Sequence, residues 1–165
     1  MRRFLKILLL IIISLFILIQ LYPRPVKNIN ANITKNDFSI TNTPPMAVQN
    51  ILKKSCNNCH SNNTVYPWYS HLQPVSWWLG DHIEEGKKEL NFSEFGTYSP
   101  RKKYKKLEEM YSEVKDDKMP LSNYTIIHKD AILNVDEKQL FLSWVDAESK
   151  KMEAVYPADS LKRKK

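Results

Sequence analysis

The stretch that most constrains the fold of this chain is Cys56-Asn57-Asn58-Cys59-His60. Two thiols three positions apart, followed at once by an imidazole, form the Cys-x-x-Cys-His pattern that attaches a haem to a polypeptide. On one helical turn the two thiols reach the two vinyl groups of one porphyrin, and the histidine binds the iron. The chain has two cysteines in all. The motif therefore predicts one covalent haem c, with Cys56 and Cys59 as its attachment points and His60 as proximal ligand.

Other sites also use a Cys-x-x-Cys pair, namely thioredoxin-type redox centres, zinc sites and structural disulfides. A zinc site of the usual kind needs a second ligand pair, and His71, His82 and His128 are not spaced as one. A thioredoxin-type site needs a strand–helix–strand context, whereas the sequence around the motif has a helical pattern. A disulfide or redox pair stays open as the alternative.

The N-terminus carries an apolar run from Ile7 to Leu21, preceded by Arg2 and Arg3. We interpret residues 1–24 as a signal anchor or signal peptide, with an uncleaved membrane anchor favoured because no small-x-small cleavage site follows. The two arginines predict a cytoplasmic N-terminus and a haem domain in the periplasm of a bacterial inner membrane. Cleavage would release the domain into the periplasm. Haem attachment outside the cytoplasmic membrane agrees with this location.

The net charge of +7 belongs to the two ends of the chain. Residues 1–27 and the last four residues are rich in Lys and Arg, and the stretch between them is slightly acidic. A nucleic-acid-binding protein needs a basic face on its folded body, so the sequence predicts no nucleic-acid partner.

We expect three further parts after the anchor, all of them helical where they fold. Residues 25–43 are polar and predict a tether, residues 44–150 predict the haem domain, and residues 151–165 predict a charged, frayed tail whose basic end is solvated or touches lipid. The fold class is therefore all-α, a cytochrome c-like bundle of short helices around one covalent haem. Helix starts are predicted at Thr43-Pro44, Pro74, Ser99-Pro100 and Asn134, the last by a capping box with Glu137.

Two segments of the domain are expected to pack on the haem. Residues 61–74 are rich in proline and aromatic residues, and Pro67 and Trp68 predict a loop over the porphyrin face. A backbone carbonyl near Pro67 is the predicted acceptor for the second nitrogen of His60. Trp78 is the third predicted contact. The basic residues between Arg101 and Lys106 are interpreted as a solvated face.

Met119-Pro120 is the best candidate for the distal side of the iron. It lies 59 residues after His60, which is enough chain to pass around a haem, and a thioether favours ferrous iron. The rival is His82, on the apolar face of its predicted helix. His71 and His128 are weaker candidates, and a five-coordinate iron is also open.

The longer pattern resembles the haem-binding domain family of small exported bacterial cytochromes c. The resemblance covers about residues 45–148, and the segments that carry it are Tyr66-Pro67-Trp68-Tyr69-Ser70, Pro74-Val75-Ser76-Trp77-Trp78, Leu90-Asn91-Phe92-Ser93-Glu94 and Met119-Pro120. It implies a mostly helical fold with one covalent haem on Cys56 and Cys59, ligated by His60 and Met119. The sequence departs from the family where Leu121 follows Pro120, since members often have a second proline there.

Three functions fit these expectations. The first is a membrane-tethered electron carrier with an unidentified redox partner protein, because two axial ligands leave no open iron position. The second is a peroxidase-like reductase of a small molecule, which needs a displaceable distal ligand and an acid–base residue. The third is a gas or redox sensor. The sequence favours the carrier over an enzyme.

Overall fold

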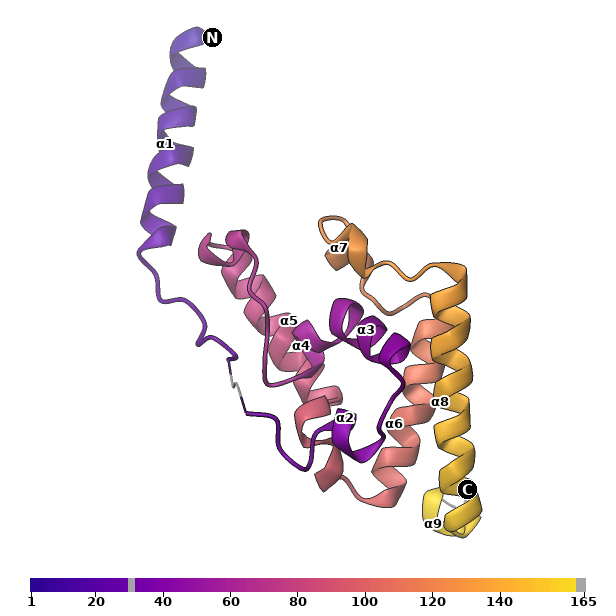
Figure 1. Cartoon of the computed structure of the whole chain (residues 1–165). Helices are drawn as coiled ribbons and strands as arrows, with labels where there is room; N and C mark the ends of the chain where they lie inside the picture. The colour runs from indigo at the N-terminus through magenta and orange to yellow at the C-terminus, as the bar shows by residue number, and fades with distance from the viewer. Residues whose placement is uncertain (30–31, 163–165) are drawn as a thin grey trace.

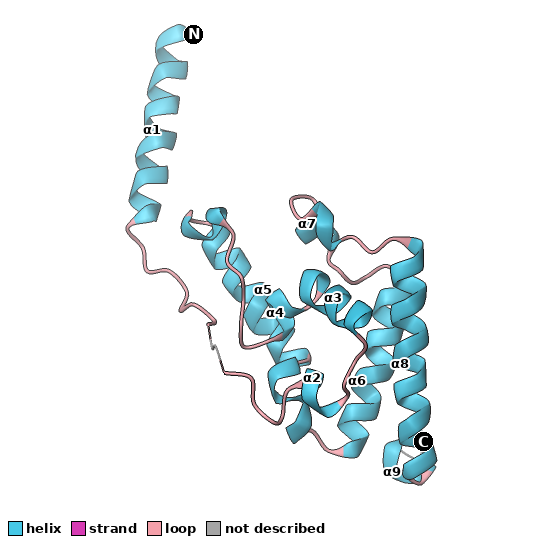
Figure 2. Ribbon diagram, in the orientation of Figure 1, coloured by secondary structure: helices cyan, strands magenta, loops and turns pink. Residues whose placement is uncertain are grey.

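The computed structural model describes residues 1–29 and 32–162, and within these ranges the chain is helical without a strand (Figure 2). One isolated bridge joins Ile29 to Asn63. This confirms the all-α prediction. The elements are α1 (Arg2–Gln20), α2 (Phe38–Thr41), α3 (Met46–Ser55), α4 (Asn57–His60), η1 (Trp68–His71), α5 (Val75–Glu89), η2 (Phe92–Thr97), α6 (Pro100–Lys115), α7 (Ser122–Thr125), η3 (Lys129–Ala131), α8 (Val135–Val155) and α9 (Ala158–Leu161).

Helix α1 projects away from the rest of the molecule (Figure 1), and none of its residues is buried. Its 19 residues extend about 28 Å, close to the thickness of the hydrocarbon core of a bilayer. It is the helix among the described residues that is long and apolar enough to cross a membrane. The predicted apolar N-terminal helix is therefore present, as an anchor or a signal.

The folded domain has two sides. Helices α6 and α8 run antiparallel along one side, while α3, α4 and α5 lie on the other (Figure 1). The main core lies between them and contains the buried residues Phe38, Val48, Ile51, Leu52, Leu90, Phe92, Phe95, Leu107, Met110, Val114, Phe141 and Val145. A smaller cluster of Tyr69, Leu79 and Ile83 joins η1 to α5.

Two of the predicted helix starts have the expected caps. The Ser99 side chain accepts a hydrogen bond from the backbone N–H of Lys102, with Pro100 at the first helical position. Asn134 and Glu137 form the predicted capping box of α8. Helix α5 begins at Val75, one residue after Pro74.

The predicted start at Thr43-Pro44 is wrong by two residues. Helix α3 begins at Met46, and Pro45 is extended with φ −57° and ψ 154°. Pro45 also restricts the residue before it to extended conformations, so Pro44 cannot begin a helix. Thr43 has a positive φ of 43° and turns the chain into this Pro-Pro segment.

Residues 25–43 do not form the predicted free tether where the structure describes them. The Asn28 amide donates to the Ser61 carbonyl at 2.8 Å and to the Thr64 hydroxyl at 2.9 Å. Phe38 is 1 % exposed and packs against Phe92 and Phe95. A polar composition suggested a linker, but one aromatic side chain and a few amides suffice to dock the segment onto the domain.

The predicted frayed tail is also wrong for residues 152–162. Helix α8 continues to Val155, and α9 follows with Leu161 only 3 % exposed. The Arg101 side chain donates to the carbonyls of Ser160 and Asp159, which fastens α9 to α6. Most of the predicted basic end, Arg163 to Lys165, lies outside the described residues.

Replacement of Phe38 by Ala tests whether residues 25–43 belong to the folded domain. The loss of a fully buried phenyl ring in the main core is expected to lower the free energy of unfolding by about 3–5 kcal/mol. Urea unfolding followed by circular dichroism measures it. Ile40→Ala in the same short helix is the control, because Ile40 is 54 % exposed and its loss should cost little. Equal, small effects of the two substitutions would contradict the docked arrangement.

Candidate functional site

The Cys-x-x-Cys-His motif forms a separate helical turn. The chain breaks at Cys56, where φ is −126°, and α4 continues from Asn57 to His60. The His60 N–H donates to the Cys56 carbonyl at 3.0 Å, which closes the turn. Cys56 packs against the main core and Cys59 against the smaller cluster. Apart from the break, the predicted helix that leads into the motif is confirmed.

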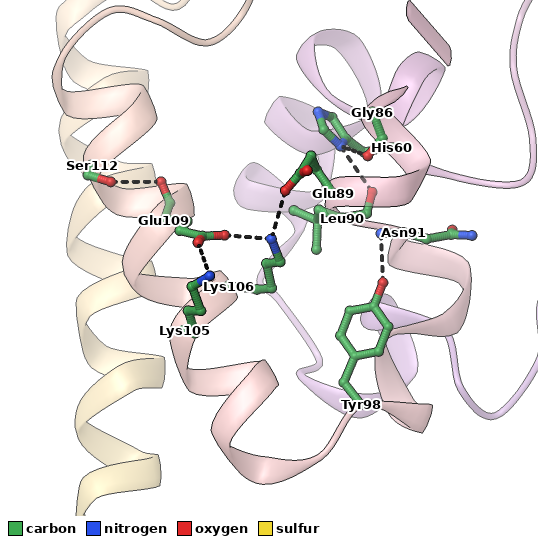
Figure 3. A network of polar contacts seen from close by, with 10 residues as sticks. All are labelled: His60, Gly86, Glu89, Leu90, Asn91, Tyr98, Lys105, Lys106, Glu109 and Ser112. Atoms are coloured by element: carbon green, nitrogen blue, oxygen red, sulfur yellow. Dashed lines mark hydrogen bonds and ion pairs between the residues drawn. The ribbon is translucent and has the colours of Figure 1, made fainter. Parts of the chain in front are cut away.

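Backbone carbonyls at the end of α5 hold the His60 ring in place. Its Nδ1 lies 2.9 Å from the Gly86 carbonyl oxygen and 3.0 Å from that of Leu90, and Figure 3 shows the other ring nitrogen turned away from both. The prediction of a carbonyl near Pro67 is therefore wrong. With Nδ1 as the donor, Nε2 keeps its lone pair, which is the form that binds a metal ion.

Electrostatics also favour the neutral imidazole. Burial lowers the pKa of His60, the Leu90 and Gly86 carbonyls oppose this, and the nearby Lys106 charge adds to the lowering. A neutral ring is the ligating form, because a protonated imidazole has no lone pair to offer.

Gly86 permits the close contact between α4 and α5. A Cβ atom at this position would lie 2.9 Å from the Cys59 carbonyl oxygen and 3.3 Å from the Cys59 Cβ. Any larger residue would therefore push α4, with Cys59 and His60, away from α5. A glycine in the last turn of a helix is the sequence signal for this contact.

Two adjoining cavities open next to the motif, of about 310 and 360 Å³. Both volumes fall within the roughly 300–1,000 Å³ range of small-molecule and cofactor sites. The residues that line both are Ser55, Cys56, His60, Glu89 and Met119. Cys59, His82, Glu85, Gly86, Pro120, Leu121 and Tyr124 also line the first, while Leu90, Phe92, Lys106, Glu109, Met110, Glu113, Val114 and Phe141 also line the second.

Met119 reaches both cavities because α6 ends in a tight reversal. Asp117 has a positive φ of 56°, and the Lys118 N–H returns to the Glu113 carbonyl at 2.9 Å. This is the Schellman pattern, which reverses the chain at a helix end. The Met119 N–H donates to the same carbonyl at 3.1 Å. The predicted distal residue thus lies in the same cavities as His60.

Of the remaining histidines, one lines a cavity next to the motif and two do not. His82 lines the first cavity, and its Nδ1 lies 2.9 Å from the Trp78 carbonyl, so it remains the rival ligand. His71 and His128 line neither cavity. His128 instead stacks on Tyr124 with ring centroids 4.2 Å apart.

The three residues predicted to contact the haem outside the motif lie away from the two cavities. Trp68 is 76 % exposed, and Pro67, Trp68 and Trp78 line neither cavity. Trp78 packs instead on the smaller cluster and against the His82 ring. Contact of these three residues with a haem remains a prediction.

Lys106 is a cavity residue that the sequence interpretation missed. It is 7 % exposed rather than solvated, and its Nζ lies 2.6 Å from Glu109 and 3.3 Å from Glu89 (Figure 3). Burial lowers the pKa of Lys106, but these two carboxylates more than offset it and raise the pKa, so the group stays cationic. Its place four residues before the buried Met110, on the same helix face, was the available signal.

The two thiols lack the features of a thioredoxin-type or zinc site. Both are free, and burial together with the Cys59 charge raises the pKa of Cys56 to about 12. A thioredoxin-type cysteine has a lowered pKa instead. Among the described residues, no three His, Cys, Asp or Glu side chains converge on one point as zinc requires. Two thiols, one neutral imidazole and one thioether around a largely apolar cavity fit a haem.

Substitution of Gly86 by Ala tests the contact between α4 and α5. The added methyl group meets backbone, so we expect a net loss of about 1–2 kcal/mol of stability despite the better helix propensity of alanine. Less haem should also be retained per chain, as measured by absorbance relative to protein mass. Gly96→Ala is not a control, because Asn36 crowds that site too. Ser112→Ala, on α6 and away from the motif, is a suitable control. Unchanged stability and haem content would contradict the close contact.

Comparison with known proteins agrees with this site. A family model described as a haem-binding domain matches residues 14–147, which include the motif, α5 and Met119. No curated protein and no solved structure matches the chain. The match extends over most of the chain and confirms the resemblance that the sequence suggested. The chain belongs to the haem-binding domain family.

Proposed function

We propose that this protein is a membrane-anchored monohaem cytochrome of the c type that transfers electrons in the bacterial periplasm. In this proposal Cys56 and Cys59 carry the thioether bonds, His60 is the proximal ligand and Met119 the distal one. The observation that carries it is the convergence of these four side chains on two adjoining cavities, three of them from the motif and Met119 from a segment 59 residues beyond His60.

The chain's own residues have defined tasks in this proposal. A bound haem supplies an iron centre that takes up and releases one electron. The carbonyls of Gly86 and Leu90 fix the tautomer of His60 and make its free nitrogen a better donor. The Met119 thioether, soft and uncharged, favours the ferrous form. Leu90, Met110 and Phe141 give the second cavity an apolar part of its wall against which a porphyrin would pack.

The location follows from α1. As an uncleaved anchor, α1 spans the inner membrane with Arg2 and Arg3 on the cytoplasmic side, and the domain lies in the periplasm. The redox partner is then a membrane or periplasmic protein.

A second function, a small-molecule reductase, has one observation in its favour. His82 and Glu85 line the first cavity beside Met119 and are titratable groups of the kind that acid–base chemistry requires. Such an enzyme would need Met119 to leave the iron, as would a gas sensor.

Optical spectra of the purified, haem-loaded full-length protein test the distal ligand. The wild type should be low-spin and show the methionine-to-iron charge-transfer band at the red end of the spectrum. Met119→Ala should abolish this band and raise the high-spin fraction, because a methyl group cannot ligate iron. His82→Ala, at another residue that lines the first cavity, is the matched control and should leave the spectrum unchanged.

Two results would contradict parts of the proposal. A spectrum that changes with His82→Ala and not with Met119→Ala would show that His82, and not Met119, is the distal ligand. A high-spin ferric wild type that reacts with peroxide, carbon monoxide or nitric oxide would favour the reductase or the sensor over the carrier.

Mass spectrometry of the intact chain tests the covalent attachment. The wild type should carry the added mass of one haem after denaturation, because thioether bonds survive unfolding. Replacement of both Cys56 and Cys59 by Ser should remove that mass. An unmodified wild-type chain from cells with the attachment machinery would rule out the c-type assignment.

A further inference from the structure

The lower end of α1 is fastened directly to the start of α5. Gln20 donates from Nε2 to the Gln73 carbonyl, and the Gln73 N–H donates to Gln20 Oε1, each at 3.0 Å. Trp77 Nε1 donates to the Pro23 carbonyl at 3.2 Å, and the Tyr22 ring meets the Trp77 ring edge-on. Figure 1 shows the end of α1 beside the first turns of α5.

A third cavity, of about 280 Å³, lies just below this junction. Its lining is made of Arg24, Pro25, Lys27, Tyr66, Ser70, His71, Ser76, Leu79 and Gly80. The lining includes two permanent cations and a histidine but no acidic residue. Among the described residues neither Arg24 nor Lys27 forms an ion pair, and Lys27 lies over the Tyr66 ring at 5.5 Å from its centroid. The cavity thus carries uncompensated positive charge.

Ser70 provides a second, independent observation. It is 7 % exposed, and its hydroxyl oxygen is buried without a hydrogen-bond partner among the described residues. A buried hydroxyl that lacks a partner is unfavourable, so such groups normally have one. Because Ser70 lines the same cavity as the two cations, an anionic oxygen acceptor suits this site.

The depth of the cavity matches a lipid headgroup. Ser76 and Gly80 line the cavity three and seven residues beyond Gln73, which corresponds to about 5–10 Å along a helix. The headgroup layer on each side of a bilayer is roughly 5–7 Å thick. The exposed side chains of Trp68, Leu72 and Val75 flank the same end of α5, and tryptophan is enriched at this depth.

We propose that this cavity binds a phosphate group, and that in the cell the group belongs to an anionic phospholipid of the outer leaflet. Arg24 and Lys27 provide the charge, and the Ser70 hydroxyl donates to a phosphate oxygen. The proposal rests on α1 as a membrane anchor. The proposal also explains why Arg24 and Lys27 lie on the periplasmic side of a membrane helix, although Lys and Arg are usually enriched on the cytoplasmic side.

Native mass spectrometry of the full-length, haem-loaded protein tests the lipid. Released from detergent micelles that contain equal phosphatidylglycerol and phosphatidylcholine, the wild type should retain one phosphatidylglycerol per chain. Arg24→Gln with Lys27→Gln should weaken this retention on the order of tenfold, since each cation near a surface contributes to anionic lipid binding. Ser70→Ala should weaken it without a change of charge. The control pair Lys102→Gln with Lys105→Gln, two exposed cations of α6, should retain the lipid.

A second arm separates the sources of the phosphate group. Inorganic phosphate added to lipid-free protein should bind much more weakly than phosphatidylglycerol. If inorganic phosphate binds as tightly as phosphatidylglycerol and prevents lipid retention, the lipid assignment is overturned in favour of a free phosphate. Equal retention of both lipids overturns the proposal as a whole. So does retention of phosphatidylglycerol that is unchanged when Arg24 and Lys27 are replaced by Gln.

Failure of the inference is distinguishable from failure of the proposed function. Carbonate extraction of membranes reports whether α1 anchors the chain, and the haem absorbance reports the cofactor site. A chain that resists extraction and has an unchanged haem spectrum, but retains no anionic lipid, would overturn the headgroup site alone.

Discussion

The structure depends on one contact, the packing of the α4 turn against the carboxyl end of α5. Glycine at position 86 allows the backbone of Cys59 to approach α5, and the Gly86 and Leu90 carbonyls at the end of that helix accept a hydrogen bond from the Nδ1–H of His60. The carbonyl end of a helix carries the negative end of its dipole, so both carbonyls suit an imidazole N–H, and that of Gly86 also accepts the capping N–H of Leu90. One contact therefore fixes the position, orientation and tautomer of His60.

The sequence predicted the parts of this molecule that depend on local chemistry. The capping residues at Ser99 and Asn134, the all-helical fold and the Cys-x-x-Cys-His motif each have a short-range signature that physical rules recognise. The cavity residue Met119 was also found, because a Met-Pro pair far enough beyond the motif for the chain to pass around a haem is a typical place for a distal ligand. Its entry into the cavity depends on the reversal of the chain at the end of α6. The left-handed conformation of Asp117 makes this reversal, and an aspartate in the sequence does not predict that conformation.

The errors concern contacts between distant segments. The acceptor for His60 was sought in the nearest proline-rich loop, but it comes from the far end of α5, 26 to 30 residues away. The region of Asn28 and Phe38 has a linker-like composition, yet one buried phenyl ring outweighs many exposed polar side chains. Lys106 was assigned to solvent because its neighbours are basic, whereas Glu109 on the same helix and Glu89 on another compensate its charge inside. Pairings of this kind depend on the tertiary fold, and a single sequence does not specify them.

The reciprocal amide pair between Gln20 and Gln73 has a mechanical consequence. A domain on a flexible linker samples many orientations relative to the membrane and meets its partner through this motion. Here the amide pair joins the end of α1 to the residues just before α5, so with α1 in a bilayer the motif and its cavities would be held near one height above the membrane. Encounters with other proteins would then depend on lateral diffusion in the membrane plane and on rotation about the axis of α1. For the electron carrier proposed above, a productive partner would present its own redox centre at that same height.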